Sequence, residues 1–260
     1  MSLWLGGTFV AILGRYVIWA GVAWLIGYVW FKRRWFHRKV VQEFPVRSEM
    51  WREIRYSVMS ILVFAAVAFA TLLAIRSGWT KVYSGIDSRG WPWFWTSILL
   101  TILLHDAYFY WTHRWMHHPW LFRHFHRIHH LSKNPTPWAA YSFSPLEAIV
   151  QAGIFPLTVF LIPIHPVAFG LFMFWQITFN VIGHTGYEFY RRSFMDSWPS
   201  WIMNTPTCHA MHHEKIHGNF GLYFSFWDKL MGTHHPEYEA RFREITSRPN
   251  ALKDSSSNPG

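Results

Sequence analysis

Long apolar stretches separated by short polar segments make up most of the first 182 residues. Residues 3–31 are apolar apart from Arg15, residues 58–75 carry no charge, and residues 91–104 open with the ring cluster WPWFW. Two further apolar stretches, 146–164 and 166–182, are separated by the sequence PIHP. A helix needs about 20 apolar residues to cross a bilayer, so the pattern predicts an all-α, integral membrane helical bundle of about four to five spans.

Two details refine this expected topology. A charge at the bilayer centre is costly, so we expect the first span to occupy the second half of residues 3–31, which lets Arg15 reach outward. No small-residue cleavage pattern follows this stretch, and it is therefore expected to be an anchor and not a removed signal peptide. Pro163 and Pro166 make the PIHP break either a turn between two spans or the tip of a re-entrant hairpin.

The charge pattern predicts the orientation of these spans. Residues 32–55 carry eight Lys or Arg against three Glu, whereas residues 76–90 carry only three basic residues. Cytoplasmic loops of membrane proteins hold the excess of basic residues, so residues 32–55 are expected to be cytoplasmic. The chain then returns to this face after residue 104 and again before residue 184. The 18 Trp and 23 Phe agree, because aromatic rings collect at membrane interfaces.

Histidines are concentrated on that same face, in three spaced motifs. Of the 17 histidines, all except His37 follow residue 104. Residues three and four apart share one face of a helix, with Cβ atoms about 5–6 Å from each other. Eight imidazoles are more than one tetrahedral zinc ion needs, so the motifs predict two metal ions. One H-x-x-x-H motif and two H-x-x-H-H motifs contain His113, His117, His126, His129, His130, His209, His212 and His213.

Local signals predict a short helix for each motif. Pro119 is expected to end the helix of the first motif and to open the helix of the second, which stops at the NP sequence of residues 134–135. Thr205 is the expected N-cap of the third helix, with Pro206 at its first position and Gly218 after its end.

Two other classes of membrane protein also use histidines. A b-type haem electron carrier places widely spaced axial histidines inside its spans, whereas adjacent histidines here lie outside the apolar stretches. A metal transporter needs polar groups near the bilayer midplane, and the middles of these stretches are nearly free of them. The chain has one cysteine and no dinucleotide-binding, phosphate-binding or haem-attachment motif. The pattern therefore favours an enzyme.

The motifs occur in a recognisable order. The segments HDAYFYWTHRWMHHPWLFRHFHRIHH, NPTPWAAYSFSPLEA, HTGYE and HAMHHEKIHGNFGLYFSFWDKLMGTHH follow one another between residues 105 and 235. This order resembles the fatty acid hydroxylase/sterol desaturase superfamily, and within it the sterol C5-desaturase-like members. The resemblance implies a di-iron centre of two Fe ions held by the eight motif histidines, with His184 as a ninth ligand. One departure is Ser144, where the family often has a histidine.

Several residues around the motifs are expected to support the centre. Metal-bound imidazoles usually donate their other N–H to a carboxylate or carbonyl, and Asp106 shares a helix face with His113, seven residues later. His105, about 80° round that helix, is expected outside the ligand set. The other residues expected to support the ligands are His118, His217, Asp228 and His234, with Glu188 as a weaker candidate. Trp138, Tyr141 and Phe143 are expected to line the substrate path.

The resemblance also implies an activity and its partners. It implies an O2-dependent oxidoreductase that desaturates or hydroxylates a lipid, with a sterol as the substrate of the most similar members and fatty acyl, ether or amino-acid-containing lipids as alternatives. No flavin motif is present, so electrons are expected from a separate donor, cytochrome b5-like or a ferredoxin with its reductase, and residues 32–55 are a possible docking site. No nucleic-acid partner is expected, and the sequence does not indicate an oligomeric state. We expect membrane spans in residues 1–97, a catalytic domain in 98–245 and a disordered tail in 246–260.

Overall fold

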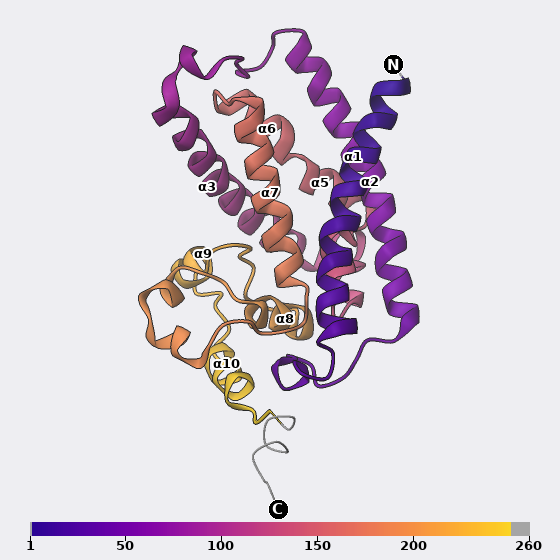
Figure 1. Ribbon diagram of the computed structural model, residues 1–260, viewed down its shortest axis with the longest axis vertical. Coiled ribbons are helices and arrows are strands. Elements are labelled where there is room, and N and C mark those ends of the chain that lie inside the picture. The colour runs from indigo at the N-terminus through magenta and orange to yellow at the C-terminus, as the bar shows by residue number, and fades with distance from the viewer. Residues whose placement is uncertain (1, 251–260) are drawn as a thin grey trace, which may run out of the picture.

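A computed structural model describes residues 2–250 of the chain (Figure 1). All regular elements among these residues are helices, and only the isolated bridges Lys39–Tyr187 and Met203–Phe224 have β geometry. The all-α prediction is confirmed. Residues 251–260, which form most of the expected disordered tail, lie outside the described residues. The first two residues of the expected tail, Thr246 and Ser247, belong to a helix.

The helices differ greatly in length. The long ones are α1 (Ser2–Trp24), which continues as a π-helical turn (Leu25–Trp30), α2 (Arg47–Arg76), α3 (Gly90–Met116) and α7 (Pro166–Gly183). The shorter ones are α4 (Pro119–Phe125), α5 (Pro145–Ala152), α6 (Ile154–Leu161), α8 (Pro206–Lys215), α9 (Phe226–Leu230) and α10 (Tyr238–Ser247). Short 3₁₀ segments include His129–Leu131 and Pro137–Tyr141.

The long helices form the expected membrane bundle. Three of those described are long and apolar enough to cross a bilayer: Trp4–Trp30, Arg47–Arg76 and Pro166–Gly183. Helix α3 has 27 residues and begins with the expected third apolar stretch, but its second half carries polar side chains such as Asp106 and Arg114. These helices lie along the long axis of the molecule (Figure 1). Apolar side chains such as Ile18, Leu62 and Leu99 are exposed on them, as lipid-facing residues would be.

The apolar stretch 146–164 folds as two short helices and not as one span. The chain bends at Gly153, where a Cβ atom would lie 2.5 Å from the hydroxyl oxygen of Tyr108 on α3. Glycine therefore permits the close approach of α3 at this bend. Helix α6 ends before the PIHP sequence, and α7 begins at Pro166 with this proline in its first turn. The predicted break is a turn that joins α6 to α7.

Arg15 does not reach outward, and that prediction is wrong. It lies near the middle of the span Trp4–Trp30, and its Nη2 atom donates to the hydroxyl of Tyr141, 3.3 Å away. The side chain is half-buried among the helices. The bundle supplies a polar partner inside, so the guanidinium does not need to extend to the interface.

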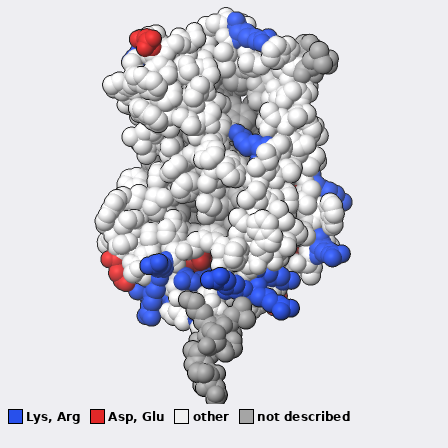
Figure 2. All heavy atoms as spheres, in the orientation of Figure 1, with Lys and Arg blue, Asp and Glu red and all other residues white. Residues whose placement is uncertain are grey.

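The polar elements form a cap at one end of the bundle. Helices α8, α9 and α10 lie together below the long helices in Figure 1. Basic side chains gather at this end, whereas charged side chains are sparse over the rest of the face shown in Figure 2. The loop after α1 is tied to the segment after α7, because Val40 N donates to Gly186 O and Glu188 N donates to Arg38 O. Helices on both sides of residue 97 contribute to one core, for example Ile61 and Phe172.

Candidate metal centre

Five histidines from three distant segments form one compact group. The ligand atoms of this five-histidine group, His113, His117, His126, His130 and His212, all lie within 4.8 Å of one another. The Nε2 atom of His113 lies 2.9 Å from that of His126. The Nε2 atom of His130 lies 3.2 Å from that of His117 and 3.0 Å from that of His212. The ends of α3 and α8 and the chain after α4 thus converge on one point.

Four further histidines form a second group beside the first. The four-histidine group contains His129, His184, His209 and His213, again with ligand atoms within 4.8 Å of one another. Its Nε2 atoms are 3.3 Å apart for His184 and His129, and 3.0 Å apart for His209 and His184. The nine residues of the two groups are the nine histidines expected as ligands from the sequence.

Hydrogen bonds at the opposite ring nitrogen fix the tautomer of five of these rings. In four rings Nδ1 lies 2.7 Å from an oxygen atom: Phe220 O for His113, Glu147 Oε1 for His126, Asn180 O for His184 and Gly218 O for His212. In His129, Nδ1 lies 3.3 Å from Ser142 O. A carbonyl or carboxylate oxygen accepts, so Nδ1 carries the proton and Nε2 of a neutral ring has a free lone pair. These lone pairs point into the two groups.

The spacing of the Nε2 atoms fits metal ions. Two unprotonated nitrogens cannot hydrogen-bond to each other, so the short contacts between His113 and His126 and between His129 and His184 fit rings that share a metal ion. At a metal–nitrogen distance of about 2.1 Å, ligands at right angles are about 3.0 Å apart and tetrahedral ligands about 3.4 Å apart. The observed distances of 2.9 to 3.3 Å are within about 0.1 Å of that range.

Burial keeps the imidazoles neutral, as metal ligands must be. Burial lowers the pKa of His113 to about 3 and that of His184 to about 4. The pKa values of His126, His129, His209, His212 and His213 are lowered well below the ordinary value, first by burial and then by neighbouring histidines. Aromatic rings exclude water from the sides of the groups, with Phe220 at 5.0 Å from the ring of His117 and Phe143 at 5.1 Å from that of His129.

The second motif does not lie on a continuous α-helix, contrary to expectation. Pro119 opens α4 as predicted, but α4 ends at Phe125, and His129 begins a 3₁₀ turn. The break separates the three side chains, because His126 and His130 join the five-histidine group while His129 joins the other. The third motif is divided in the same way on a regular helix, because His209 and His213 of α8 join the four-histidine group and His212 joins the other. Each H-x-x-H-H motif therefore contributes to both groups.

The helix of the third motif begins as predicted and ends earlier than expected. Thr205 is the N-cap and its hydroxyl accepts from Cys208 N, with Pro206 in the first turn. The helix ends at Lys215, and Ile216, not Gly218, follows it in the left-handed conformation. Gly218 instead orients a histidine, because its carbonyl accepts from Nδ1 of His212. A Cβ atom at Gly218 would lie 2.6 Å from Thr233 O.

The carboxylates expected to bind the ligands act on the backbone around them. Asp106 Oδ1 accepts from Tyr223 N and Phe224 N, at 3.1 and 3.2 Å, and makes no direct bond to His113. Asp228 accepts from Phe220 N at 2.8 Å and therefore fixes the residue whose carbonyl orients His113. Glu188 accepts from Thr207 N at the start of α8. These three carboxylates therefore fix backbone segments near the histidine groups and do not bond to the imidazoles themselves.

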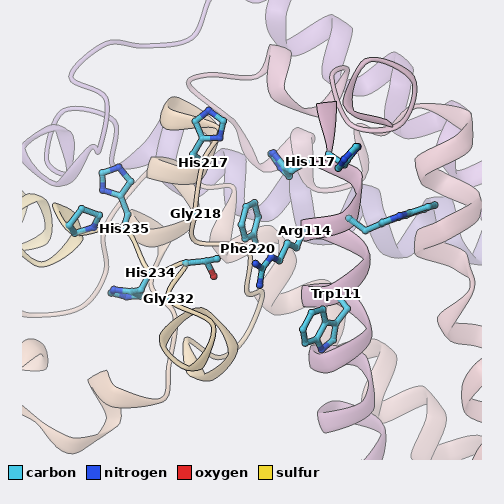
Figure 3. Close-up of a pocket in the computed structure, with 13 residues that line it drawn as sticks. Trp111, Arg114, His117, His217, Gly218, Phe220, Gly232, His234 and His235 are labelled. Atoms are coloured by element: carbon cyan, nitrogen blue, oxygen red, sulfur yellow. The ribbon is translucent and has the colours of Figure 1, made fainter. Parts of the chain in front are cut away.

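The three other histidines expected near the ligands lie outside both groups. His118, His217 and His234 line an open hollow of about 790 Å³ on the outer side of the five-histidine group, together with His117 itself (Figure 3). His118 and His217 are exposed. Trp111 and Arg114 of α3 form one wall of this hollow, and His217, His234 and His235 come from the loops opposite (Figure 3). As expected, His105 is in neither group; its Nδ1 bonds to the Tyr223 hydroxyl at 2.7 Å.

Sequence reasoning missed Glu147, the carboxylate that does contact a ligand. Its Oε1 atom lies 2.7 Å from His126 Nδ1, and both side chains are buried. Ser144, which departs from the family pattern, positions it: the Ser144 hydroxyl accepts from Glu147 N and donates to Phe125 O, the residue before His126. A glutamate three residues after a Ser-Pro N-cap, within an apolar stretch, was the available signal.

A small cavity in the bundle lies next to the four-histidine group, because its lining residues Phe143 and Asn180 contact His129 and His184. Its volume is about 20 Å³, so it is nearly filled by the side chains around it, which include Tyr141, Phe155 and Met173. Two of the residues expected to line the substrate path, Tyr141 and Phe143, line this cavity. Trp138 does not line this cavity, and its carbonyl accepts from Tyr16 and Ser57 on α1 and α2.

Comparisons with known proteins agree with this geometry. A profile of the family described as fatty acid hydroxylase matches residues 98–233. A Delta(7)-sterol 5(6)-desaturase of Gibberella zeae is 30% identical over 220 residues, which cover 82% of this chain and 66% of that protein. Another of Aspergillus fumigatus is 29% identical, covering 86% of this chain and 60% of the relative. A lathosterol oxidase of Rattus norvegicus is 28% identical, covering 72% and 62%.

The chain spans about three fifths to two thirds of the length of these curated relatives. No solved structure matches the chain significantly.

Proposed function

Because the chain belongs to the fatty acid hydroxylase family, we propose that it is a membrane-embedded di-iron oxidoreductase that uses O2 and external electrons to oxidise a lipid. The proposed reaction is desaturation of a sterol. The proposal is supported most by the two histidine groups, whose Nε2 atoms converge at ligand distances beside the membrane bundle.

The donor set supports iron as the metal. Nine neutral imidazoles in groups of five and four leave the full positive charge on each ion, and imidazole ligands suit iron as well as zinc and copper. A closed structural zinc site needs only four ligands. Two adjacent irons, when bound, supply the electrons and the Lewis acidity needed to activate O2 for attack on an unactivated C–H bond.

The protein's own residues orient the ligands and keep the site dry. Glu147 and the carbonyls of Phe220, Asn180 and Gly218 hold the imidazoles in the tautomer that presents Nε2. Such bonds fix ring orientation and raise ligand basicity. Phe143 packs on the ring of His129 and shields the buried four-histidine group from water, which protects a reactive site from side reactions.

The position of the inner cavity supports a lipid substrate. Phe143 and Asn180 line this cavity, and each contacts a histidine of the four-histidine group, through the ring of His129 and Nδ1 of His184 respectively. The cavity lies within the apolar bundle, so a lipid approaching it need not enter water. The names of the relatives, Delta(7)-sterol 5(6)-desaturase and lathosterol oxidase, favour a sterol.

The charge distribution supports a cytoplasmic cap and an acidic electron donor. Eight Lys or Arg occur between residues 32 and 55, and basic side chains collect at the capped end (Figure 2). Cytoplasmic segments of membrane proteins carry this excess of positive charge. The hollow in Figure 3 brings solvent to His117, and no acidic residue is among the described residues that line it. An acidic redox protein at this face would approach the five-histidine group.

Lipid profiling of cells with and without the gene tests the proposal. We expect a sterol that differs by two hydrogens, and the change should disappear when His126 or His209 is replaced by Ala. A gain of one oxygen would instead indicate hydroxylation. An unchanged lipid profile combined with weakly held, exchangeable metal would contradict the proposed enzyme and favour metal transport.

A further inference from the structure

A charged residue lies within the first membrane span. Arg15 is the one Lys, Arg, Asp or Glu between residues 2 and 31, and it stands near the middle of Trp4–Trp30. Ionisable residues inside spans are costly and rare, and they usually mark a binding site or a pathway. The surroundings of Arg15 therefore indicate what its charge is used for.

The protein satisfies this guanidinium only in part. Its Nη2 atom donates to the Tyr141 hydroxyl at 3.3 Å, and the same hydroxyl donates to Gln176 Oε1 at 3.1 Å. Its Nε atom is buried and has no hydrogen-bond partner. No carboxylate among the described residues forms an ion pair with Arg15. A guanidinium has five N–H donors in a fork that matches oxygen acceptors, so acceptors are missing here.

The unsatisfied donors lie at the wall of an apolar cleft. This cleft has a volume of about 430 Å³ and is lined by residues of α1, α2, α6 and α7. Among the described residues that line it, Arg15 alone is charged, and typical neighbours are Ile12, Leu72, Val159 and Phe169. Ligand sites for small molecules usually have volumes of about 300–1,000 Å³, apolar walls and few polar groups. The surface between the helices is hollowed in the upper half of Figure 2 and carries no acidic atoms there.

The cleft leads towards the metal centre. Phe155 and Met173 line both the cleft and the inner cavity beside the four-histidine group. Tyr141, which accepts from Arg15, also lines the inner cavity. A lipid in the cleft would thus have its polar end at Arg15 while its body lies against the side chains that separate the cleft from the cavity.

We propose that the cleft binds an amphipathic lipid and that Arg15 recognises an oxygen acceptor at its polar end. The acceptor is the hydroxyl of a sterol or the carboxylate of a fatty acid, since both offer lone pairs to the free Nε–H. Arg15 is then a positioning residue, which determines how a substrate from the bilayer enters the inner cavity. The link to substrate entry rests on the proposed lipid oxidation, whereas the binding itself does not depend on metal.

Photo-labelling of the purified protein in lipid nanodiscs tests this site. The probes are a diazirine sterol with a free hydroxyl and its deoxy analogue, and a diazirine fatty acid and the alkane analogue in which a methyl group replaces the carboxyl. We expect the protein to bind one oxygen-bearing probe at least about tenfold more tightly than its oxygen-free analogue, as loss of a hydrogen bond to a charged group predicts. The pair that shows the preference identifies the polar group.

Variants then assign the preference to Arg15. Arg15→Gln should bring the ratio of the two affinities close to one. Arg76 is an exposed arginine at the end of α2 that does not line the cleft, so Arg76→Gln should leave this ratio unchanged. Arg15→Lys keeps the charge for membrane insertion but lacks the Nε donor, and should reduce the preference several-fold. Equal binding of the oxygen-bearing and oxygen-free probes by the wild-type chain, or an unchanged preference in Arg15→Gln and Arg15→Lys, would overturn the proposal. Metal content, measured on the same samples, separates this outcome from failure of the metal centre.

Discussion

Replacing Glu147 should weaken one of the two metal sites without touching a ligand. Glu147 Oε1 lies 2.7 Å from Nδ1 of His126, and both side chains are buried, so water cannot replace the lost acceptor. Mutation of such a partner of a metal-bound histidine typically lowers metal affinity about 10–100-fold. At 1.36 kcal/mol for each factor of ten, this corresponds to about 1.4–2.7 kcal/mol.

The size of the effect should depend on what replaces the carboxylate. Glu147→Gln keeps an oxygen that accepts from Nδ1 and loses only the charge, so we expect a decrease of about tenfold. Glu147→Leu removes the acceptor as well and leaves the buried Nδ1–H of His126 unpaired, so the decrease should approach about 100-fold. Only the ion of the five-histidine group should be affected, because His126 belongs to that group.

Chelator competition on purified protein measures this change. Metal retained per chain is followed against chelator concentration at fixed pH, and one of two release steps should move to lower chelator concentration. Glu53→Gln is the matched control, because Glu53 is equally buried but bonds to Thr136 and not to a motif histidine. Release curves of Glu147→Leu that coincide with wild type, or an equal shift in Glu53→Gln, would refute the role assigned to Glu147.

Three further predictions concern the grouped histidines, the metal-free fold and the N-cap of α5. His117→Ala and His209→Ala should each remove one ion and abolish lipid oxidation while the chain still inserts, which metal analysis and lipid profiling check; an active variant would remove that histidine from the ligand set. In the metal-free protein, burial lowers the pKa of the nine histidines below the value of about 6.5 that they have when unfolded. The unfolded chain therefore binds more protons as the pH falls below 6.5, and stability should drop by up to about 1.4 kcal/mol per buried imidazole and pH unit; a melting temperature unchanged between pH 7.5 and 5.5 would contradict this. Ser144→Ala should lose about 1 kcal/mol through the missing N-cap of α5, measured by thermal unfolding, whereas Ser144→Asn should recover most of it.

The clustering of the motif histidines could be predicted in part, because imidazoles four positions apart lie on the same side of a helix. His113 and His117 lie in one group, and His209 and His213 lie in the other. The apolar pattern likewise predicted the membrane bundle, because span length depends only on composition.

The partners of the ligands were not predictable in the same way. Asp106 shares a helix face with His113, but the acceptor for His113 is the carbonyl of Phe220, more than a hundred residues away. Every residue has a carbonyl, so sequence gives no signal for which one will accept. The division of both H-x-x-H-H motifs between the two groups also depends on the tertiary fold, which places His129 beside His184 and His212 beside His130.

The position of the Arg15 side chain could not be predicted from its own span either, because it also depends on the tertiary fold. An isolated span would move this charge towards the interface, whereas the folded bundle offers the Tyr141 hydroxyl from a segment 126 residues away. The cleft beside it is built by four helices and is not visible in any one of them.

The central claim is that the two histidine groups hold two metal ions, and locating those ions tests it most directly. Diffraction data from the iron-loaded protein, collected at the iron absorption edge, should show two anomalous peaks per chain. One peak should lie about 2.1 Å from Nε2 of His113 and His126, and the other at the same distance from Nε2 of His184 and His209. A single peak, or peaks away from these atoms, would contradict the account.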